Sequence, residues 1–194
     1  MQQESIKNKI RRIHAAIRNC RKCRLSLSRK HAVPGEGPVP AKIMFVGEAP
    51  GKEEDLQGLP FVGRSGKFLN LILELVKLPR NELFITSSVK CRPPENRTPR
   101  DDELKICKAN WLDRQISLVN PGIIVLLGKV ALKQVLSKKD NLLRLHGKIY
   151  RYDSRNYFVT FHPSAAMRFS KIKKQFITDL KKLKALLGKQ NLSL

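Results

Sequence analysis

Apolar residues recur along the chain with two different periods, and together they predict alternating strands and helices. Short, mostly apolar runs at Ile43–Val46, Leu83–Thr86, Ile123–Leu127 and Tyr157–Phe161 are typical of buried strands. The segment Lys148–Tyr152 mixes apolar and charged residues, so we expect a short strand or an edge ribbon there.

Between these runs, apolar residues return every three or four positions, which is the period of a helix with one buried face. This spacing predicts helices at 5–19, 64–78, 128–136 and 171–194. A further helix is expected to start after Thr98, because a threonine side chain can cap a helix and Pro99 suits a first turn.

Strands that alternate with helices favour a mostly parallel sheet with helices on both faces. We therefore expect a single α/β domain over residues 1–194, built on a central, mostly parallel, four-stranded sheet. Residues 1–40 would form an N-terminal helix and a basic loop, and residues 171–194 a basic C-terminal helix.

The charge of the chain points to a polyanionic partner. Lysine and arginine number 39 against 16 aspartates and glutamates, which gives a net charge of +23. The longest apolar run, Ile123–Leu127, is too short to cross a membrane, and residues 1–5 lack the apolar core of a signal peptide. We expect nucleic acid as the partner, no membrane, and a cytoplasmic, nucleoid-associated location of prokaryotic type.

Four cysteines suggest a metal centre. Thiols in the cytoplasm stay reduced, so disulfides are disfavoured. Cys20 and Cys23 are separated by two residues, a spacing that lets two thiolates reach one metal centre, and the other two cysteines are Cys91 and Cys107. Spacing alone leaves zinc and iron–sulfur equally open, because thiolates suit both.

Three polar loops follow predicted strands, at 48–55, 87–97 and 162–168. The carboxyl ends of parallel strands lie at one edge of a sheet, so these loops should meet there. Together with Phe61 they would supply carboxylates, amides, an aromatic ring and a histidine. Such groups can hold a flat polar base by stacking and by hydrogen bonds to its edge.

Several ordered motifs make the chain resemble a known family. They are GEAPG at 47–51, PFVG at 60–63, KCRPP at 90–94 with Asn96 and Arg97, HPS at 162–164, and the four cysteines with their spacing. In these motifs, from about Cys20 to Phe169, the chain resembles the family 4 uracil-DNA glycosylases, the iron–sulfur branch of the uracil-DNA glycosylase superfamily. The resemblance implies a 4Fe-4S cluster on Cys20, Cys23, Cys91 and Cys107.

The resemblance also implies a reaction, the hydrolysis of the bond between uracil and deoxyribose in DNA. The nucleotide must first be flipped out of the duplex, and the leaving base and the sugar then develop opposite charges. His162 would hydrogen-bond the O2 oxygen of uracil, and Glu48 would orient water or stabilise the sugar cation. Asn96 is a further catalytic candidate near the sugar.

The same resemblance assigns the base-binding groups. Phe61 would stack on uracil, the backbone at Ala49 would bind its edge, and Glu54 would lie near C5, where it disfavours the methyl group of thymine. Many members have asparagine at the place of Ser87. A serine hydroxyl cannot present an acceptor and a donor in one plane, so we expect activity with weaker discrimination against cytosine.

Contacts with uracil-containing DNA are assigned to a group of polar, basic and small residues. The segment 164–168 resembles a loop that wedges into the duplex. The full set is Arg64, Arg97, Ser164, Ala165, Met167 and Arg168. We expect a monomer, and the sequence does not identify downstream repair proteins as partners.

Two other functions stay open. One is a glycosylase that accepts a broader set of deaminated bases, an alternative that Ser87 keeps open. The other is a non-catalytic, cluster-bearing protein that binds nucleic acid, although it would give no reason for Glu48, Glu54 and His162. A nucleotide-binding enzyme fits poorly, because the Gly47–Gly51 loop is acidic and lacks the lysine and serine of a P-loop.

Overall fold

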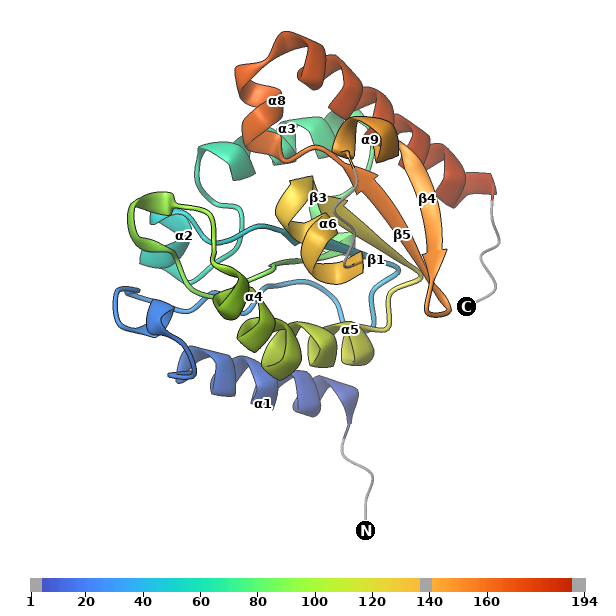
Figure 1. The fold of residues 1–194 in the computed structure, drawn as a ribbon. Helices are drawn as coiled ribbons and strands as arrows, with labels where there is room; N and C mark the ends of the chain where they lie inside the picture. The colour runs from blue at the N-terminus through green and yellow to red at the C-terminus, as the bar shows by residue number, and fades with distance from the viewer. Residues whose placement is uncertain (1–4, 137–140, 190–194) are drawn as a thin grey trace.

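A computed structural model of the chain describes residues 5–136 and 141–189. Within these residues, five strands form one sheet in the order β2-β1-β3-β5-β4 (Figure 1). The strands are β1 (Ile43–Gly47), β2 (Leu83–Ser87), β3 (Ile123–Leu127), β4 (Lys148–Tyr152) and β5 (Arg155–Thr160). The pairs β1–β2, β1–β3 and β3–β5 are parallel, as the alternation of strands and helices predicts.

The expected count of four strands is wrong, because β4 joins the sheet as an antiparallel edge strand beside β5. Asp153 and Ser154, both with positive φ angles of 46° and 59°, make the tight turn between the two strands. The side chains of β4 are exposed or half-buried. Its mixture of charged and aromatic residues therefore carries little of the apolar signal that marks a buried strand.

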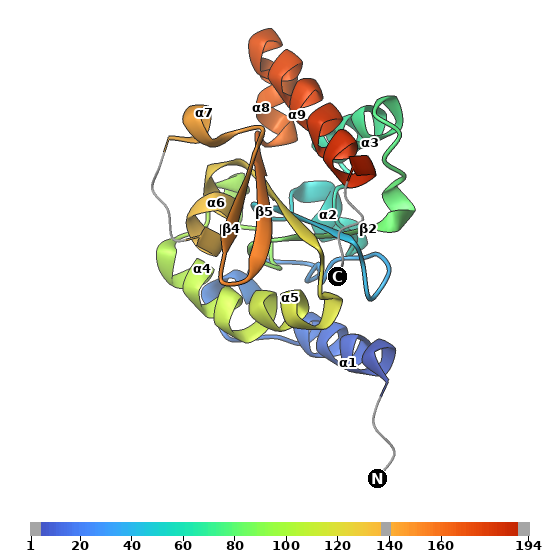
Figure 2. The same cartoon turned by 90° about the vertical axis from the view of Figure 1, so that its right-hand side faces the viewer.

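Helices cover both faces of the sheet (Figures 1 and 2). Helix α1 (Ile6–Arg18) precedes β1, and α2 (Lys52–Gln57) and α3 (Arg64–Leu75) lie between β1 and β2 in the sequence. Helices α4 (Asp101–Cys107) and α5 (Asp113–Val119) lie between β2 and β3 in the sequence, joined by a π-helical stretch at Lys108–Leu112. Helix α6 (Gly128–Leu136) follows β3. The last are α7 (Leu142–Leu145), α8 (Pro163–Arg168) and α9 (Ser170–Lys189).

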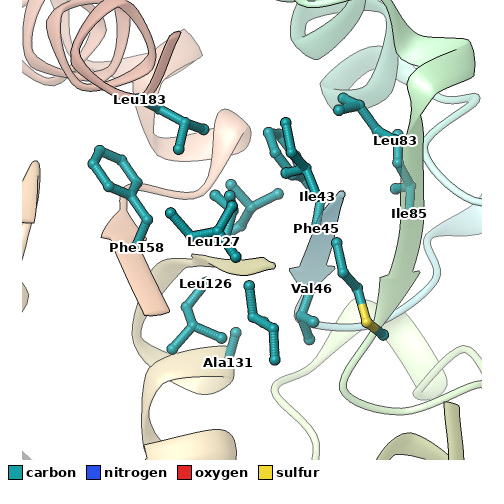
Figure 3. Close-up of a cluster of buried hydrophobic side chains, with 14 of the residues drawn as sticks. Ile43, Phe45, Val46, Leu83, Ile85, Leu126, Leu127, Ala131, Phe158 and Leu183 are labelled. Atoms are coloured by element: carbon teal, nitrogen blue, oxygen red, sulfur yellow. The ribbon is translucent and has the colours of Figure 1, made fainter. Parts of the chain in front are cut away.

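Alternate side chains of the central strands point to opposite faces, which builds two apolar layers (Figure 3). Phe45 of β1 lies on the side of Leu183 from α9, whereas Val46 lies on the side of Ala131 from α6. All residues of β1, β2 and β3 are buried. The parallel sheet is therefore held by helices on both sides, and its carboxyl edge is left for the loops.

Several helix boundaries differ from the sequence prediction, and α3, predicted to end at residue 78, ends at Leu75. The helix expected after Thr98 begins at Asp101, because the carboxylate of Glu103 accepts the Arg100 N–H at 2.7 Å and caps the turn there. The C-terminal helix begins at Ser170, one residue before the predicted start, and positions 190–194 of that prediction lie outside the described residues. Among the described helices, none is long and apolar enough to span a membrane.

Candidate active site

The loops that leave the carboxyl ends of β1, β2 and β5 surround one cavity of about 500 Å³. The sequence predicts this meeting of strand-end loops. The lining residues come from the β1 loop and α2, the start of α3, the β2 loop, and the β5–α8 junction. They are Glu48, Ala49, Pro50, Gly51, Lys52, Glu53, Glu54, Phe61, Gly63, Arg64, Ser65, Pro93, Asn96, Arg97, His162, Ser164 and Arg168.

Most of the residues predicted to contact the base, the sugar or DNA lie in this lining, but three do not. Ser87, Ala165 and Met167 are absent from it. Ser87 is 4% exposed at the end of β2, where it pairs with Gly47 of β1. A side chain on Gly47 would place its Cβ 3.5 Å from the Ser87 hydroxyl, so that hydroxyl lies just beside the strand end that carries the β1 loop.

Phe61 occupies a strained turn at one side of the cavity. Its φ angle is 52°, in the left-handed region that residues with a Cβ rarely adopt. Two glycines make room for it. A Cβ on Gly47 would lie 2.6 Å from Cζ of the Phe61 ring, and a Cβ on Gly66 would collide with the Phe61 carbonyl. The sequence therefore keeps both neighbours small where the aromatic residue must fit.

His162 caps α8 and is held in one protonation state. The backbone N–H of Ser164 donates to His162 Nδ1 at 3.2 Å, and the Ser164 hydroxyl lies 2.8 Å from the same atom. A backbone N–H can only donate, so Nδ1 accepts and the proton of the neutral ring is assigned to Nε2. Burial lowers the pKa of His162 to about 4, so the ring is neutral at pH 7.

The rings of Phe61 and His162 belong to loops that are far apart in the sequence. Their centroids lie 6.0 Å apart, with the ring planes tilted by 33°. Gly128, which has a φ angle of 89°, gives His162 its space, since a Cβ there would lie 3.0 Å from the His162 Cβ. The cavity thus combines an aromatic face with a neutral imidazole.

Two acidic residues that follow β1, Glu48 in the loop and Glu54 on α2, differ in their surroundings. Burial raises the pKa of Glu48 above its ordinary value of 4.5. The carboxylate of Glu54 accepts the backbone N–H groups of Gly51 at 3.0 Å and Gly63 at 2.8 Å. Glu54 therefore joins the β1 loop to the start of α3 and fixes the wall between them.

The β2 loop brings Asn96 and Arg97 to the cavity. Asn96 has a φ angle of 55°, and its Oδ1 accepts from Arg92 Nε at 2.8 Å. Arg97 makes two hydrogen bonds, at 2.7 and 2.9 Å, to the fully buried carboxylate of Glu103. This bidentate pair holds the β2 loop against α4.

The segment predicted as a wedge loop is a short helix, α8. His162 caps it and Pro163 occupies its first position, which favours a helical turn over a loop. Ala166 packs into the core, whereas Met167 is 38% exposed. Phe169, the C-cap residue of this helix, is 58% exposed.

The four cysteines lie around a second apolar cluster. Cys91 and Cys107 are buried in it together with Trp111, and Cys20 and Cys23 pack against it. None of the four is in a disulfide. Burial raises the pKa of Cys91 to about 11 and that of Cys107 to about 12, and charges on neighbouring cysteines add to both shifts.

Two N–H donors reach the sulfur atoms. Arg29 Nη1 donates to Cys91 Sγ at 2.8 Å, and Trp111 Nε1 donates to Cys20 Sγ at 3.2 Å. Trp111 could have been expected here, because it follows Cys107 by one helical turn, whereas no pattern marks Arg29. In the described part of the chain, no three histidine, cysteine, aspartate or glutamate side chains are grouped so that they could hold a metal ion.

Comparisons with known proteins find relatives that cover most of the chain. The family model described as the uracil DNA glycosylase superfamily matches residues 34–184. The Type-4 uracil-DNA glycosylase of Saccharolobus solfataricus is 43% identical over 92% of this chain and 86% of its own length. That of Archaeoglobus fulgidus is 37% identical over 90% and 91%. The Type-5 uracil-DNA glycosylase of Thermus thermophilus is 34% identical over 54% of each chain.

Proposed function

The chain belongs to the uracil-DNA glycosylase superfamily, and from this premise we propose that it flips uracil out of DNA and hydrolyses its N-glycosidic bond, leaving an abasic site. The observation that carries the proposal is the cavity that joins Phe61, Glu48 and the neutral His162. An aromatic face, a hydrogen-bond donor and a carboxylate are the groups that base excision needs at one place.

The base binds first. Phe61 stacks on the extruded uracil while the backbone around Ala49 meets the edge of the ring. Support for this comes from the burial of Phe61 and from the glycines that give its ring room. Glu54 stands at the C5 side, where a thymine methyl would have to fit. Its hydrogen bonds to two loops support a rigid wall there, because a wall that cannot move excludes the larger base.

Bond cleavage leaves negative charge on uracil, and His162 stabilises it. The neutral imidazole donates from Nε2–H to the O2 oxygen of the departing base. The fixed Nδ1 acceptor and the lowered pKa support this assignment, since both keep the proton on the atom that must donate. A donor that is oriented before the reaction needs no rearrangement when the charge develops.

Glu48 acts on the sugar. As a carboxylate it stabilises the oxocarbenium-like deoxyribose or orients the attacking water. Its raised pKa supports a partly desolvated position, in which a negative charge acts more strongly than it would in water. Asn96, on the opposite loop of the same cavity, supplies a further polar contact near the sugar.

DNA is held mainly through its phosphates. The net charge of +23 supplies a grip that does not depend on sequence, with Arg64, Arg97 and Arg168 at the cavity. Ser164 and Ala165 lie on the same short helix as Met167, which is 38% exposed and would fill the space that the flipped nucleotide leaves. We propose that the protein acts as a monomer at the nucleoid.

We also propose that Cys20, Cys23, Cys91 and Cys107 hold a 4Fe-4S cluster. The chemistry of the donor set suits such a group, because the four thiols are free, share one apolar cluster and receive N–H hydrogen bonds from Arg29 and Trp111, although no three described side chains are grouped as they would be around a single metal ion. Cys20 and Cys23 after α1, Cys91 on the β2 loop and Cys107 on α4 would hold the cluster, which would tie these segments together. Its contribution is to the fold, and hydrolysis uses the other side chains.

The experiment that tests the function is an abasic-site assay. Two duplexes that differ only in one uracil or thymine are incubated with the protein, and strand breaks are counted after alkali treatment. Breaks at uracil alone support the proposal. Binding of both duplexes without breaks would instead favour a non-catalytic nucleic-acid-binding protein, and breaks at other deaminated bases in a wider panel would favour the broader glycosylase.

A further inference from the structure

We propose that Arg80 is a positioning residue that holds Phe61 in its base-stacking position. The inference rests on the proposed function, because it concerns the residue that would stack on uracil. Arg80 does not line the cavity. It stands in a 3-10 turn, Arg80–Glu82, immediately before β2, and it acts from behind the aromatic residue.

The guanidinium of Arg80 contacts the carbonyl groups on both sides of the Phe61 Cα atom. Nη2 donates to the Pro60 carbonyl at 2.6 Å, and Nη1 makes a longer contact of 3.5 Å with the Phe61 carbonyl. Nη1 also donates to Asn70 Oδ1 on α3 at 2.8 Å. One planar side chain thus joins the turn that carries the ring to the helix that follows it.

The turn needs such a constraint because of its backbone conformation. Phe61 has a φ angle of 52°, and a residue with a side chain keeps such a conformation only when its surroundings enforce it. Gly66 permits the close approach of the Phe61 carbonyl but does not orient it. The two carbonyl contacts of Arg80 supply the orientation.

The other side of Arg80 is anchored to the sheet. Glu36 Oε1 accepts from Arg80 Nη2 at 2.7 Å and from Nε at 3.3 Å. The backbone of Glu36 pairs with Ile85 of β2 through hydrogen bonds of 3.0 and 2.7 Å. The turn at Phe61 is therefore connected to a buried strand whose last residue is Ser87, beside the base-binding edge.

The exposure of the Arg80–Glu36 ion pair indicates that Arg80 orients the Phe61 turn more than it stabilises the fold. The side chains of Arg80 and Glu36 are 24% and 40% exposed, and ion pairs at that exposure contribute little to the free energy of folding. A lysine would keep the charge, but its single ammonium group cannot replace a planar fork that reaches two carbonyls, an amide and a carboxylate. The variant Arg80→Lys therefore separates charge from geometry.

The experiment measures how strongly free uracil inhibits excision, since free uracil competes for the stacking position without the DNA. Arg80→Lys is expected to raise the inhibition constant about tenfold, the scale of one base–aromatic stacking contact, and to lower kcat while KM for DNA is unchanged. Asn70→Ala, which removes one acceptor from Arg80, is expected to give a smaller rise. Lys133→Ala, which breaks a surface ion pair with Asp101 at 2.6 Å, is the control with no change expected.

A double-variant cycle with Phe61→Ala shows whether Arg80 acts through Phe61. In the Phe61→Ala background, Arg80→Lys should have no further effect on inhibition by uracil. Unchanged inhibition in both Arg80→Lys and Asn70→Ala, or an Arg80→Lys effect that adds in full to that of Phe61→Ala, would overturn the inference while wild-type excision stands. Absence of excision by the wild type would instead overturn the proposed function itself.

Discussion

The backbone N–H of Ser164 donates to Nδ1 of His162 at 3.2 Å, within the first turn of α8. This bond places the proton of the neutral ring on Nε2, the only ring nitrogen left to face a ligand. A helix start therefore determines the chemistry of the candidate catalytic residue.

Stability should fall as the pH falls from about 6.5 to about 4. Burial lowers the pKa of His162 from 6.5 to about 4, so the unfolded chain binds a proton in this interval and the folded protein does not. The contribution of His162 is present above pH 6.5 and lost by pH 4, with an upper bound of about 3 kcal/mol. It is measured as the free energy of unfolding in urea across this range.

The matched variants are His162→Asn, whose amide oxygen can still cap α8, and His31→Asn at an exposed histidine. The fall should be smaller in His162→Asn and unchanged in His31→Asn. Part of it remains in both, because burial also lowers the pKa of His14 to about 4. Equal pH profiles for His162→Asn and the wild type would contradict a buried neutral imidazole.

The rate of uracil excision should fall at acidic pH because Glu48 becomes protonated. The pKa of Glu48 is raised by burial, so its carboxylate is protonated, and its role lost, at a higher pH than that of an exposed glutamate. Single-turnover rates should fall as the pH falls through this raised pKa. Glu48→Gln should be about 100-fold slower and flat down to about pH 4, where His162 gains a proton. An acidic limb at the same pH in Glu48→Gln would assign it to another group.

Selectivity between uracil and cytosine should be weaker than an asparagine at position 87 would give. The Ser87 hydroxyl lies at the strand end beside Gly47, where it offers one short polar group. Ser87→Asn is expected to improve the ratio of excision from U- and C-containing duplexes about tenfold. Ser117→Asn, an exposed site on α5, serves as the control. Identical ratios in the wild type and Ser87→Asn would refute the idea.

Iron analysis tests the cluster. Freshly purified protein should carry about four iron atoms per chain and absorb visible light, and Cys107→Ser should lose both. Removal of iron by a chelator should lower the thermal midpoint by several degrees, because metal binding contributes to folding. A protein that instead contains one zinc ion and no sulfide would contradict the iron–sulfur assignment.

The sequence predicts the parts of the fold that depend on local apolar pattern. The strands at Ile43 and Ile123 are continuous apolar runs, and the rule that parallel strands end at one edge brings Glu48 and His162 to one cavity. The short strand or edge ribbon expected at Lys148–Tyr152 is confirmed as β4, but its mixture of charged and aromatic residues does not predict that it joins the sheet as a fifth strand. Thr98 is a residue type that can cap a helix. The helix begins later, at Asp101, because the buried Glu103 carboxylate accepts the Arg100 N–H there.

Arg80 and Arg29, which support the cavity and the cysteine cluster, could not be predicted from the sequence for a different reason. Arg80 contacts Pro60, Phe61, Asn70 and Glu36. The sequence distances between Arg80 and these residues match no helix or strand period, so they do not predict the contacts. Arg29 reaches Cys91 across 62 positions of sequence. Such contacts arise only when the fold is complete, so a pattern of neighbouring residues cannot reveal them.

The most direct test of the account is to measure excision and DNA binding together in His162→Ala. Single-turnover release of uracil from a duplex should fall about 100- to 1000-fold, as expected when a donor to a developing anion is removed. Binding to the same duplex should persist, and His31→Ala should match the wild type in both. Uracil release at the wild-type rate by His162→Ala would contradict the central claim that this histidine stabilises the departing base.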